Sequence, residues 1–305
     1  MRLHPNDDQA MFLSALDQMM QGKSAAWRTS PQWDRYEWSD AFDRELEESG
    51  FLDCAIEETL GPVAAAEMTF RLATLPIAVE AAASALLRPK FAADLPRPLA
   101  IIESDHAQAI RFLPVARSVL SLGGDSIMSA LIEPHAVASV ESLYAFPMGV
   151  LKKALDWRPL NADPEAVRAQ WRVALAAELA GALKGALASV VSHVRERHQF
   201  GRPLGSFQAI QHRLAGAATK VEASYWLTLK AAQSGDSIDA ALALGYAQDA
   251  STKVVYDLHQ FMGAMGLTLE HPLHRWTYRA RLLRSSLRGS INNLRTVAVE
   301  RWRAA

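Results

Sequence analysis

The sequence predicts a mainly α-helical protein with a small β-region between two helical parts. Apolar residues recur at three- and four-residue steps over residues 6–88 and again over residues 163–302, which is the period of amphipathic helices. Between these parts the apolar runs become short and rich in branched residues, as in strands. We therefore expect an N-terminal helical domain over residues 1–93, a reduced antiparallel β-domain over residues 94–162 and a four-helix bundle over residues 163–305.

Composition and charge narrow the class of protein. The chain has 305 residues, of which 50% are hydrophobic and 21% charged, as in a globular protein. A formal net charge of -1 provides no field for nucleic acid or an anionic membrane. The single cysteine, Cys54, cannot form an internal disulfide, which fits a reducing cytoplasm. The N-terminus is too polar for a signal peptide, and no charge-free apolar run is long enough to span a membrane. We expect a soluble, cytoplasmic protein.

The first helical part contains a clear start signal. Pro62 follows Gly61 and suits the first position of a helix, because its missing N–H has no partner there in any case. In the middle part, the proline pair at 96 and 98 acts as a linker. Gly123-Gly124-Asp125 fits a hairpin turn between two strands. The expected strands are 99–102, 118–122 and 127–132.

The four helices of the last part have recognisable ends. Asp163 caps the first helix, Pro164 occupies its first position, and its apolar face continues to Arg197, about ten turns and on the order of 50 Å later. Short breaks separate the helices, as expected of a bundle. The predicted helices are 163–197, 206–233, 237–262 and 272–302.

The junction between the first two of these helices is the main candidate site. Gly201, Pro203 and Gly205 interrupt the helical pattern, and the hydroxyl of Ser206 can cap the helix that follows. Arginine and glutamine side chains and the free amides of a helix start meet there. Such groups suit a phosphate. An ordinary interhelix turn with solvated arginines fits the same pattern, and the spacing alone leaves both interpretations open.

Two motifs in this region resemble those of a known family. Arg197-x-x-Phe200-Gly201, with Gln208 one turn later, is similar to the flavin-contacting motif of the acyl-CoA dehydrogenases. Gln260-Phe261-Met262-Gly263-Ala264-Met265-Gly266, followed by Thr-x-Glu, is similar to the family's Gln-x-x-Gly-Gly-x-Gly motif. The resemblance covers the chain from residue 163 to its end. It implies an acyl-CoA dehydrogenase-like fold.

The resemblance also implies a cofactor and its contacts. Family members are FAD enzymes that desaturate an acyl-CoA thioester, with a carboxylate as the base. In the family these two motifs hold the diphosphate and adenosine end of a flavin whose ring lies in the neighbouring subunit. The cofactor-binding residues implied here are Arg197, Gln199, Phe200, Gln208, Gln260, Gly263 and Ala264.

The family's catalytic base has no clear counterpart. The glutamate of the family's Tyr-Glu-Gly-Thr run matches Arg288, and a guanidinium has no lone pair with which to accept a proton. The other known position of the base matches Trp171-Arg172, again without a carboxylate. Glu178 and Glu270 are acids near helical apolar faces, but a catalytic role is disfavoured for both. The catalytic residue is left unassigned, and the usual flavin-covering loops are not visible in the β-region.

These features lead to three hypotheses of function. Residues 270–281 resemble a variant subgroup in which some members form heteromeric complexes acting on bulky, including steroid, acyl-CoA. The first hypothesis is therefore a subunit that completes a partner's FAD site. A self-sufficient homo-oligomeric dehydrogenase and a non-catalytic helical scaffold are the alternatives. A metal site is disfavoured, because His271 and His274 lack further ligands and Glu103-x-x-His106 is a single such motif in the sheet segment.

Overall fold

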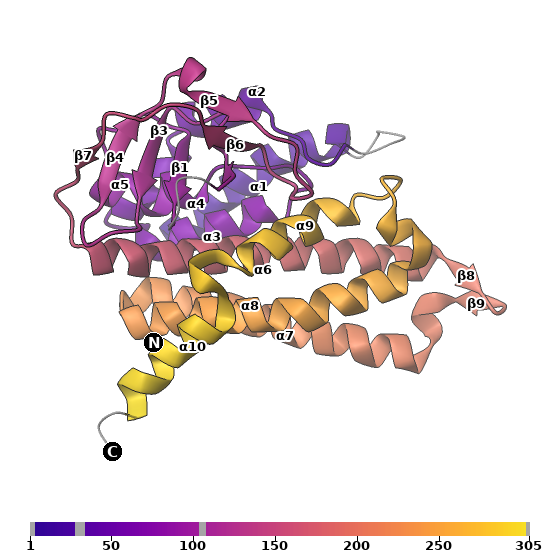
Figure 1. Ribbon diagram of the computed structural model, residues 1–305. Coiled ribbons are helices and arrows are strands. Elements are labelled where there is room, and N and C mark those ends of the chain that lie inside the picture. Colours follow the sequence, from indigo (N-terminus) through magenta and orange to yellow (C-terminus); the bar gives the residue numbers. More distant parts are fainter. Residues whose placement is uncertain (1–3, 28–33, 104–107, 303–305) are drawn as a thin grey trace.

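A computed structural model describes residues 4–27, 34–103 and 108–302 of the chain. One long helix, α6 (Pro164–Glu196), runs through the middle of the molecule (Figure 1). The N-terminal helices and the sheets lie on one side of α6, and the C-terminal helices α7, α8 and α10 lie on the other (Figure 1). The mainly helical architecture with a small β-region that the sequence predicts is confirmed.

The N-terminal part is helical, as expected. Its helices are α1 (Asp7–Trp27), α2 (Asp40–Glu48), the 3-10 helix η1 (Phe51–Ile56), α3 (Gly61–Ala73), α4 (Ala82–Leu86) and α5 (Arg88–Phe91). Pro62 lies in the first turn of α3, which confirms the predicted helix start. Four side-chain groups tie this part to the linker before the first strand. The buried guanidinium of Arg97 bonds both carboxylate oxygens of Asp43, at 3.0 and 2.7 Å, and its Nε donates to Ser84. Glu80 in turn accepts a hydrogen bond from the backbone N–H of Leu99.

The β-region contains two small sheets. One has the order β1-β3-β4-β7 and the other β2-β6-β5. Their strands are β1 (Leu99–Ile102), β2 (Ile110–Arg111), β3 (Ser118–Ser121), β4 (Met128–Leu131), β5 (Val137–Ser139), β6 (Met148–Leu151) and β7 (Arg158–Pro159), with a short 3-10 helix η2 (Pro134–Ala136) before β5. The predicted hairpin between β3 and β4 is confirmed by their antiparallel pairing.

The expectation of a purely antiparallel β-region is wrong in one respect. β1 pairs with β3 in parallel, with Leu99 opposite Ser118 and Ile102 opposite Ser121. The intervening chain passes through β2, which belongs to the other sheet, and returns to β3 in the original direction. Apolar patterning gives the faces of a strand and says nothing of its direction, so the sequence did not indicate this crossover.

The C-terminal helices begin and end largely where predicted. They are α6, α7 (Gln208–Ser234), α8 (Ser237–Met262), α9 (Leu273–Leu283) and α10 (Gly289–Trp302). The carboxylate of Asp163 accepts hydrogen bonds from the N–H groups of Glu165 and Ala166, which confirms the predicted cap of α6. Asp236 caps α8 in the same way.

The single last helix expected over residues 272–302 is wrong. The chain kinks between α9 and α10 at a 3-10 turn, η5 (Ser286–Arg288), where Leu287 has φ 49° and ψ 40° and Arg288 has φ 66°. Left-handed backbone is unfavourable for a branched residue such as leucine. The apolar spacing continues through the kink, so the pattern gave no sign of it.

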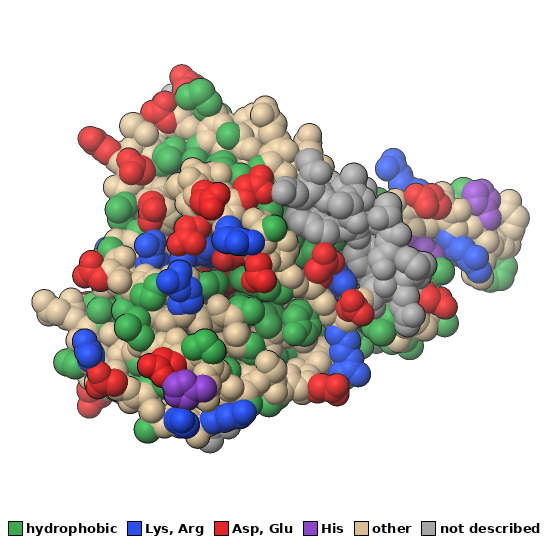
Figure 2. Space-filling model, turned by 90° about the horizontal axis from the view of Figure 1, so that it is seen from above, with side chains coloured by type: hydrophobic (Ala, Val, Ile, Leu, Met, Phe, Trp, Pro, Cys, Tyr) green, Lys and Arg blue, Asp and Glu red, His purple; other side chains and the backbone are tan. Residues whose placement is uncertain are grey.

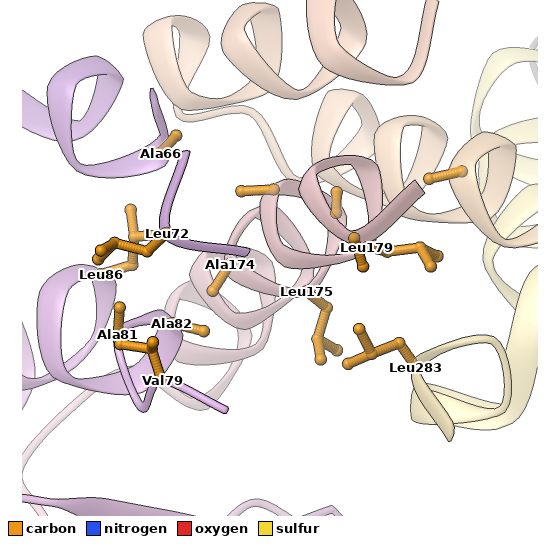
Figure 3. Close-up of a cluster of buried hydrophobic side chains, with 14 of the residues drawn as sticks. Ala66, Leu72, Val79, Ala81, Ala82, Leu86, Ala174, Leu175, Leu179 and Leu283 are labelled. Atoms are coloured by element: carbon orange, nitrogen blue, oxygen red, sulfur yellow. The ribbon is translucent and has the colours of Figure 1, made fainter. Parts of the chain in front are cut away.

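Helix α6 is the centre of the core. Leu175 and Leu179 of α6 face Leu72 of α3, the α4 segment and Leu283 of α9 (Figure 3). By length and composition α6 could cross a membrane, but 83% of its most apolar stretch is buried inside the protein, as in a core helix. Acidic and basic side chains alternate over the face shown in Figure 2, without a large area of one sign.

Two glycines on α6 allow neighbouring elements to approach closely. A Cβ on Gly181 would lie 2.1 Å from the carbonyl oxygen of Phe70 on α3, and a Cβ on Gly185 would lie 2.5 Å from the carbonyl oxygen of Thr74. Both neighbours are backbone atoms, which cannot turn away as a flexible side chain can. The close packing of α3 on α6 therefore requires the absence of a side chain at these positions.

The Gly181→Ala variant is expected to lose about 2 kcal/mol of unfolding free energy, because the added methyl overpacks a backbone contact. Chemical denaturation at fixed pH measures this difference. Gly216→Ala on α7 is the matched control: a Cβ added there would have no atom of the described chain within 4 Å. There the same change is expected to be neutral or to stabilise by about 0.5 kcal/mol through the unfolded chain. Equal stabilities of the two variants would contradict the close approach.

Candidate functional site

A β-hairpin replaces the expected simple turn between α6 and α7. Its strands are β8 (His198–Gln199) and β9 (Arg202–Pro203), and Phe200 and Gly201 form the tip with φ of 55° and 78°. Two successive positive φ angles are typical of a two-residue hairpin turn, in which glycine is favoured. The hairpin projects beyond the body of the molecule (Figures 1 and 2).

The predicted capping role of Ser206 is wrong. Ser206 belongs to a 3-10 turn, η3 (Leu204–Ser206), and its hydroxyl donates to the carbonyl of Pro203 at 2.7 Å. Helix α7 begins two residues later, after Phe207, and has no side-chain cap. The glycines and the proline correctly predicted a break in the helix, but Ser206 does not cap the first N–H groups of α7.

A cleft of about 670 Å³ opens beside this hairpin. Its walls come from the end of α6, the start of α7, the end of α8 and the 3-10 turn η4 (Gly263–Leu267). Five of the seven residues that the sequence singles out line it: Arg197, Gln199, Gln260, Gly263 and Ala264. The volume lies within the range of about 300 to 1,000 Å³ that is usual for small-molecule sites.

The other two predicted residues lie outside the cleft lining. Phe200 is at the hairpin tip, with 87% of its surface exposed and its ring 6.1 Å from that of Phe207. Gln208 is exposed at the first turn of α7. The structure therefore brings Arg197, two carboxamides and the small residues of η4 together in one cleft. Phe200 and Gln208 do not line this cleft.

The cleft contains one arginine whose charge is not already balanced. Arg197 makes no ion pair with any residue in the described part of the chain. Arg213 also lines the cleft, but its Nε donates to Asp257 at 3.1 Å and its guanidinium lies 4.6 Å above the ring of Phe261. Burial acts to raise the pKa of Asp257, but hydrogen bonds from Lys253 and Arg213 outweigh it and hold the pKa below its ordinary value. Arg213 thus has a carboxylate partner, which it shares with Lys253, whereas Arg197 has none among the described residues and is available to a ligand.

Residues that the sequence analysis did not select complete the lining. His193 lies one helical turn before Arg197 on the same face of α6, and burial together with the charge of Arg197 lowers its pKa. Glu270 contributes a carboxylate to the opposite wall. Counting four residues back from Arg197 along α6 would have found His193. Arg213 is one helical turn beyond Ala209 and could have been found in the same way.

The donors in the cleft fit the diphosphate of a dinucleotide. A guanidinium can pair with phosphate oxygens through two parallel N–H groups, and carboxamides add neutral donors. Gly263 has φ 63° and ψ −145°, and a Cβ added to it would meet no atom of the described chain within 4 Å, so the wall is open there. The residues present therefore suit the phosphate end of FAD.

A cluster of side chains around Arg111 lies between β2 and α6. The guanidinium of Arg111 in β2 bonds both carboxylate oxygens of Glu178 on α6, at 2.7 and 2.6 Å. It also lies over the rings of Phe112, Phe146 and Trp171, at 5.2 to 5.6 Å from their centres. Both carboxylate oxygens of Glu178 are thus committed to an ion pair. This gives Glu178 a structural role, in line with the low expectation of a catalytic one.

Neither family position for the catalytic base contains a carboxylate here. Arg288 is exposed at the kink between α9 and α10, and Arg172 bonds Asn293 and Glu165. A different acid, Glu103, lies against both positions. Its carboxylate accepts hydrogen bonds from the indole of Trp171 at 2.9 Å and from the backbone N–H of Leu287 at 2.7 Å. From the sequence, Glu103 was considered only as part of a Glu-x-x-His motif. The histidine of that motif, His106, lies outside the described residues.

The two histidines near the cleft bond to protein groups. His274 lies within 3.0 Å of the backbone carbonyls of His271 and Asp34. Burial lowers the pKa of His271 to about 4, so it is neutral near pH 7. In the part of the chain that the structure describes, no three potential metal ligands gather.

The fold is that of solved acyl-CoA dehydrogenases, and part of the chain is similar in sequence to that family. Residues 169–301 match the family model "Acyl-CoA dehydrogenase, C-terminal domain". The 3-sulfinopropanoyl-CoA desulfinase of Variovorax paradoxus is 33% identical over 174 residues, which cover 56% of this chain and 42% of that protein. The chain thus spans less than half the length of this relative.

Solved structures show the same fold over nearly the whole chain. The ChsE4–ChsE5 complex from Mycobacterium tuberculosis gives a TM-score of 0.79 at 19% identity and covers 98% of both chains. Butyryl-CoA dehydrogenase from Megasphaera elsdenii gives a TM-score of 0.76 at 19% identity, covering 98% of this chain and 99% of that one. These findings confirm the predicted resemblance to the acyl-CoA dehydrogenases, and this resemblance implies FAD as the cofactor.

Proposed function

We propose that this chain is a subunit of an acyl-CoA dehydrogenase-type flavoenzyme and that its cleft holds the diphosphate end of an FAD whose ring lies in a partner subunit. The observation that carries the proposal is the convergence of Arg197, Gln199 and Gln260 on one open cleft at the end of the bundle. Arg197 is free there to pair with an anion from outside the chain. The ChsE4–ChsE5 structure, by its name a complex of two proteins, supports a heteromeric arrangement.

In this proposal the chain's residues bind and position the cofactor. FAD, when bound, supplies the acceptor for the hydride that leaves the acyl-CoA. Arg197 pairs with the diphosphate, and the carboxamides of Gln199 and Gln260 donate to it. The open wall at Gly263 and Ala264 lets the backbone approach the nucleotide. We assign no base to this chain, because Arg288 cannot accept a proton and Glu178 is held by Arg111.

The side-chain cluster between β2 and α6 supports the proposal that the flavin ring lies in a partner subunit. Arg111, Glu178 and three aromatic rings occupy the region between the β-strands and α6. An isoalloxazine ring could enter this region only if the buried Arg111–Glu178 ion pair and the aromatic rings around it moved apart. Breaking such a pair commonly costs about 3 to 5 kcal/mol.

A self-sufficient dehydrogenase is the second candidate, and one observation favours it. The carboxylate of Glu103 lies against Trp171 and Leu287, next to both positions at which the family places its base. Both of its oxygens accept hydrogen bonds, which keeps it in place. In this alternative, Glu103 would be released from these donors when substrate binds.

Purification of the affinity-tagged chain from its native host tests the proposal. We expect a complex with a second dehydrogenase-like chain that contains flavin, whereas the chain expressed alone is colourless. A colourless chain that co-purifies with no such partner would refute the proposal. A chain that is yellow by itself, with a flavin absorbance bleached by acyl-CoA, would establish the self-sufficient enzyme instead.

A further inference from the structure

A second, smaller cleft of about 280 Å³ lies between α8 and α9. The turn η4 separates the two clefts: Met265 lines the first and Leu267 lines the second. Helices α8 and α9 contact each other, and α10, which follows α9 after the kink, crosses α8 (Figure 1). Nothing in the proposed FAD site uses this second cleft.

The second cleft is rich in positive charge. Arg281 and Arg284 stand three residues apart near the end of α9, so both face the same side. Neither makes an ion pair with a residue of the described chain, and the guanidinium of Arg284 donates to the hydroxyl of Thr252 at 3.2 Å. Among the described residues, no carboxylate lines this cleft. Two guanidinium groups are therefore left without a counter-charge.

A structural role near the helix end explains such arginines in many proteins, because cations interact favourably with the last carbonyls of a helix. Arg279, half a turn earlier, follows that pattern and donates to the carbonyls of Ile77, Leu75, Ala73 and Arg275. The side chains of Arg281 and Arg284 donate to no carbonyl in the described structure. Both residues line the second cleft.

Besides the two arginines, the cleft is lined by Tyr278, Thr277 and His259, and Nδ1 of His259 has no hydrogen-bond partner among the described residues. Tyr278 lies one turn before Arg281, lines the cleft, and its hydroxyl has no partner among the described residues. The hydroxyl of Thr277 is already engaged with the carbonyl of Leu273 at 3.2 Å and with Nε2 of His259 at 3.0 Å. A ligand here meets two guanidinium forks and a phenol. The two guanidinium groups without a counter-charge favour an anionic ligand with several acceptor oxygens.

We propose that the cleft between α8 and α9 is a binding site for the phosphate group of a small molecule, held by Arg281, Arg284 and the hydroxyl of Tyr278. Two guanidinium groups favour a phosphate dianion over a carboxylate, because each fork can pair with two oxygens. The volume is below the range of about 300 to 1,000 Å³ that is usual for larger ligands, which suits a phosphate with a small substituent.

Fluorine NMR of the full chain labelled with 3-fluorotyrosine tests this site directly. The chain has six tyrosines, and the Tyr278→Phe variant assigns the resonance of Tyr278. Inorganic phosphate is titrated at constant ionic strength, with methyl phosphate and acetate in parallel. We expect a saturable shift of the Tyr278 resonance with both phosphates, and a weaker response to acetate.

Variants decide where the phosphate binds. The Arg281→Gln/Arg284→Gln double variant is expected to bind phosphate at least about tenfold more weakly. Arg117→Gln/Arg295→Gln, which removes two exposed arginines outside the cleft, is the control for net charge and is expected to leave the titration unchanged. Arg197→Gln is expected to leave it unchanged too, which separates this site from the proposed FAD cleft. A Tyr278 resonance that does not move, responds equally to acetate, or moves equally in the double variant would overturn the proposal.

Discussion

The Arg197→Gln variant is expected to weaken the binding of FAD to the purified complex by about 10- to 100-fold. A hydrogen bond to a charged group contributes about 1.5 to 3 kcal/mol, and each 1.4 kcal/mol is a factor of about ten in affinity. Glutamine keeps a polar chain of similar shape but loses the charge and the fork. Flavin absorbance per mole of protein, followed during dialysis against increasing volumes of buffer, measures the retained cofactor.

Arg195→Gln is the matched control for this prediction. Arg195 lies two residues before Arg197, is exposed, and does not line the cleft. The variant has the same change in net charge at nearly the same place, and we expect it to retain FAD as the unaltered complex does. Equal retention by the two variants would show that Arg197 does not contact the diphosphate.

The Glu178→Met variant is expected to lose about 3 to 5 kcal/mol of unfolding free energy, because it leaves the Arg111 guanidinium buried without its counter-charge. Arg279 lies in the same region. Burial lowers its pKa to about 10, and the negative charge of Glu178 opposes that effect. Removing Glu178 therefore affects two buried cations. Denaturant unfolding at fixed pH, followed by far-ultraviolet circular dichroism, gives the difference.

Two further variants separate the buried ion pair from a simple change of size. Arg111→Met/Glu178→Met is expected to be more stable than Glu178→Met alone, since no unpaired Arg111 is left in the core. Asp156→Asn breaks the exposed pair with Arg158, whose side chains are 78% and 81% exposed, and is expected to change stability by less than about 1 kcal/mol. A Glu178→Met variant as stable as Asp156→Asn would contradict the role given to the pair.

Local chemistry made the helix ends predictable, and the resemblance of two motifs to a known family pointed to the larger cleft. Asp163 and Pro164 act on the first turn of α6 through groups two or three residues away, so the printed sequence contains the whole interaction. The arginine and glutamine motifs are far apart in the sequence, and local chemistry does not join them. Their resemblance to the motifs of the acyl-CoA dehydrogenases led to the expectation that Arg197, Gln260 and Gly263 lie in one region, and all three line the larger cleft.

The features that the sequence did not predict depend on distant contacts. Glu178 bonds Arg111, which is 67 residues away, and Leu287 is held by Glu103, 184 residues earlier in the chain. Neither the apolar period of a segment nor a helix-capping residue indicates such a distant partner. The parallel pairing of β1 with β3 and the kink at Leu287 likewise follow from how the layers pack. They leave the apolar spacing of their own segments unchanged.

The position of the larger cleft, at the outer end of the bundle and beside a projecting hairpin, has a thermodynamic consequence. If two chains each hold one end of the same nucleotide, every bound molecule strengthens their association, and every dissociation of the subunits loosens the nucleotide. Dissociation of the subunits on dilution and loss of flavin absorbance would then report the same coupled equilibrium.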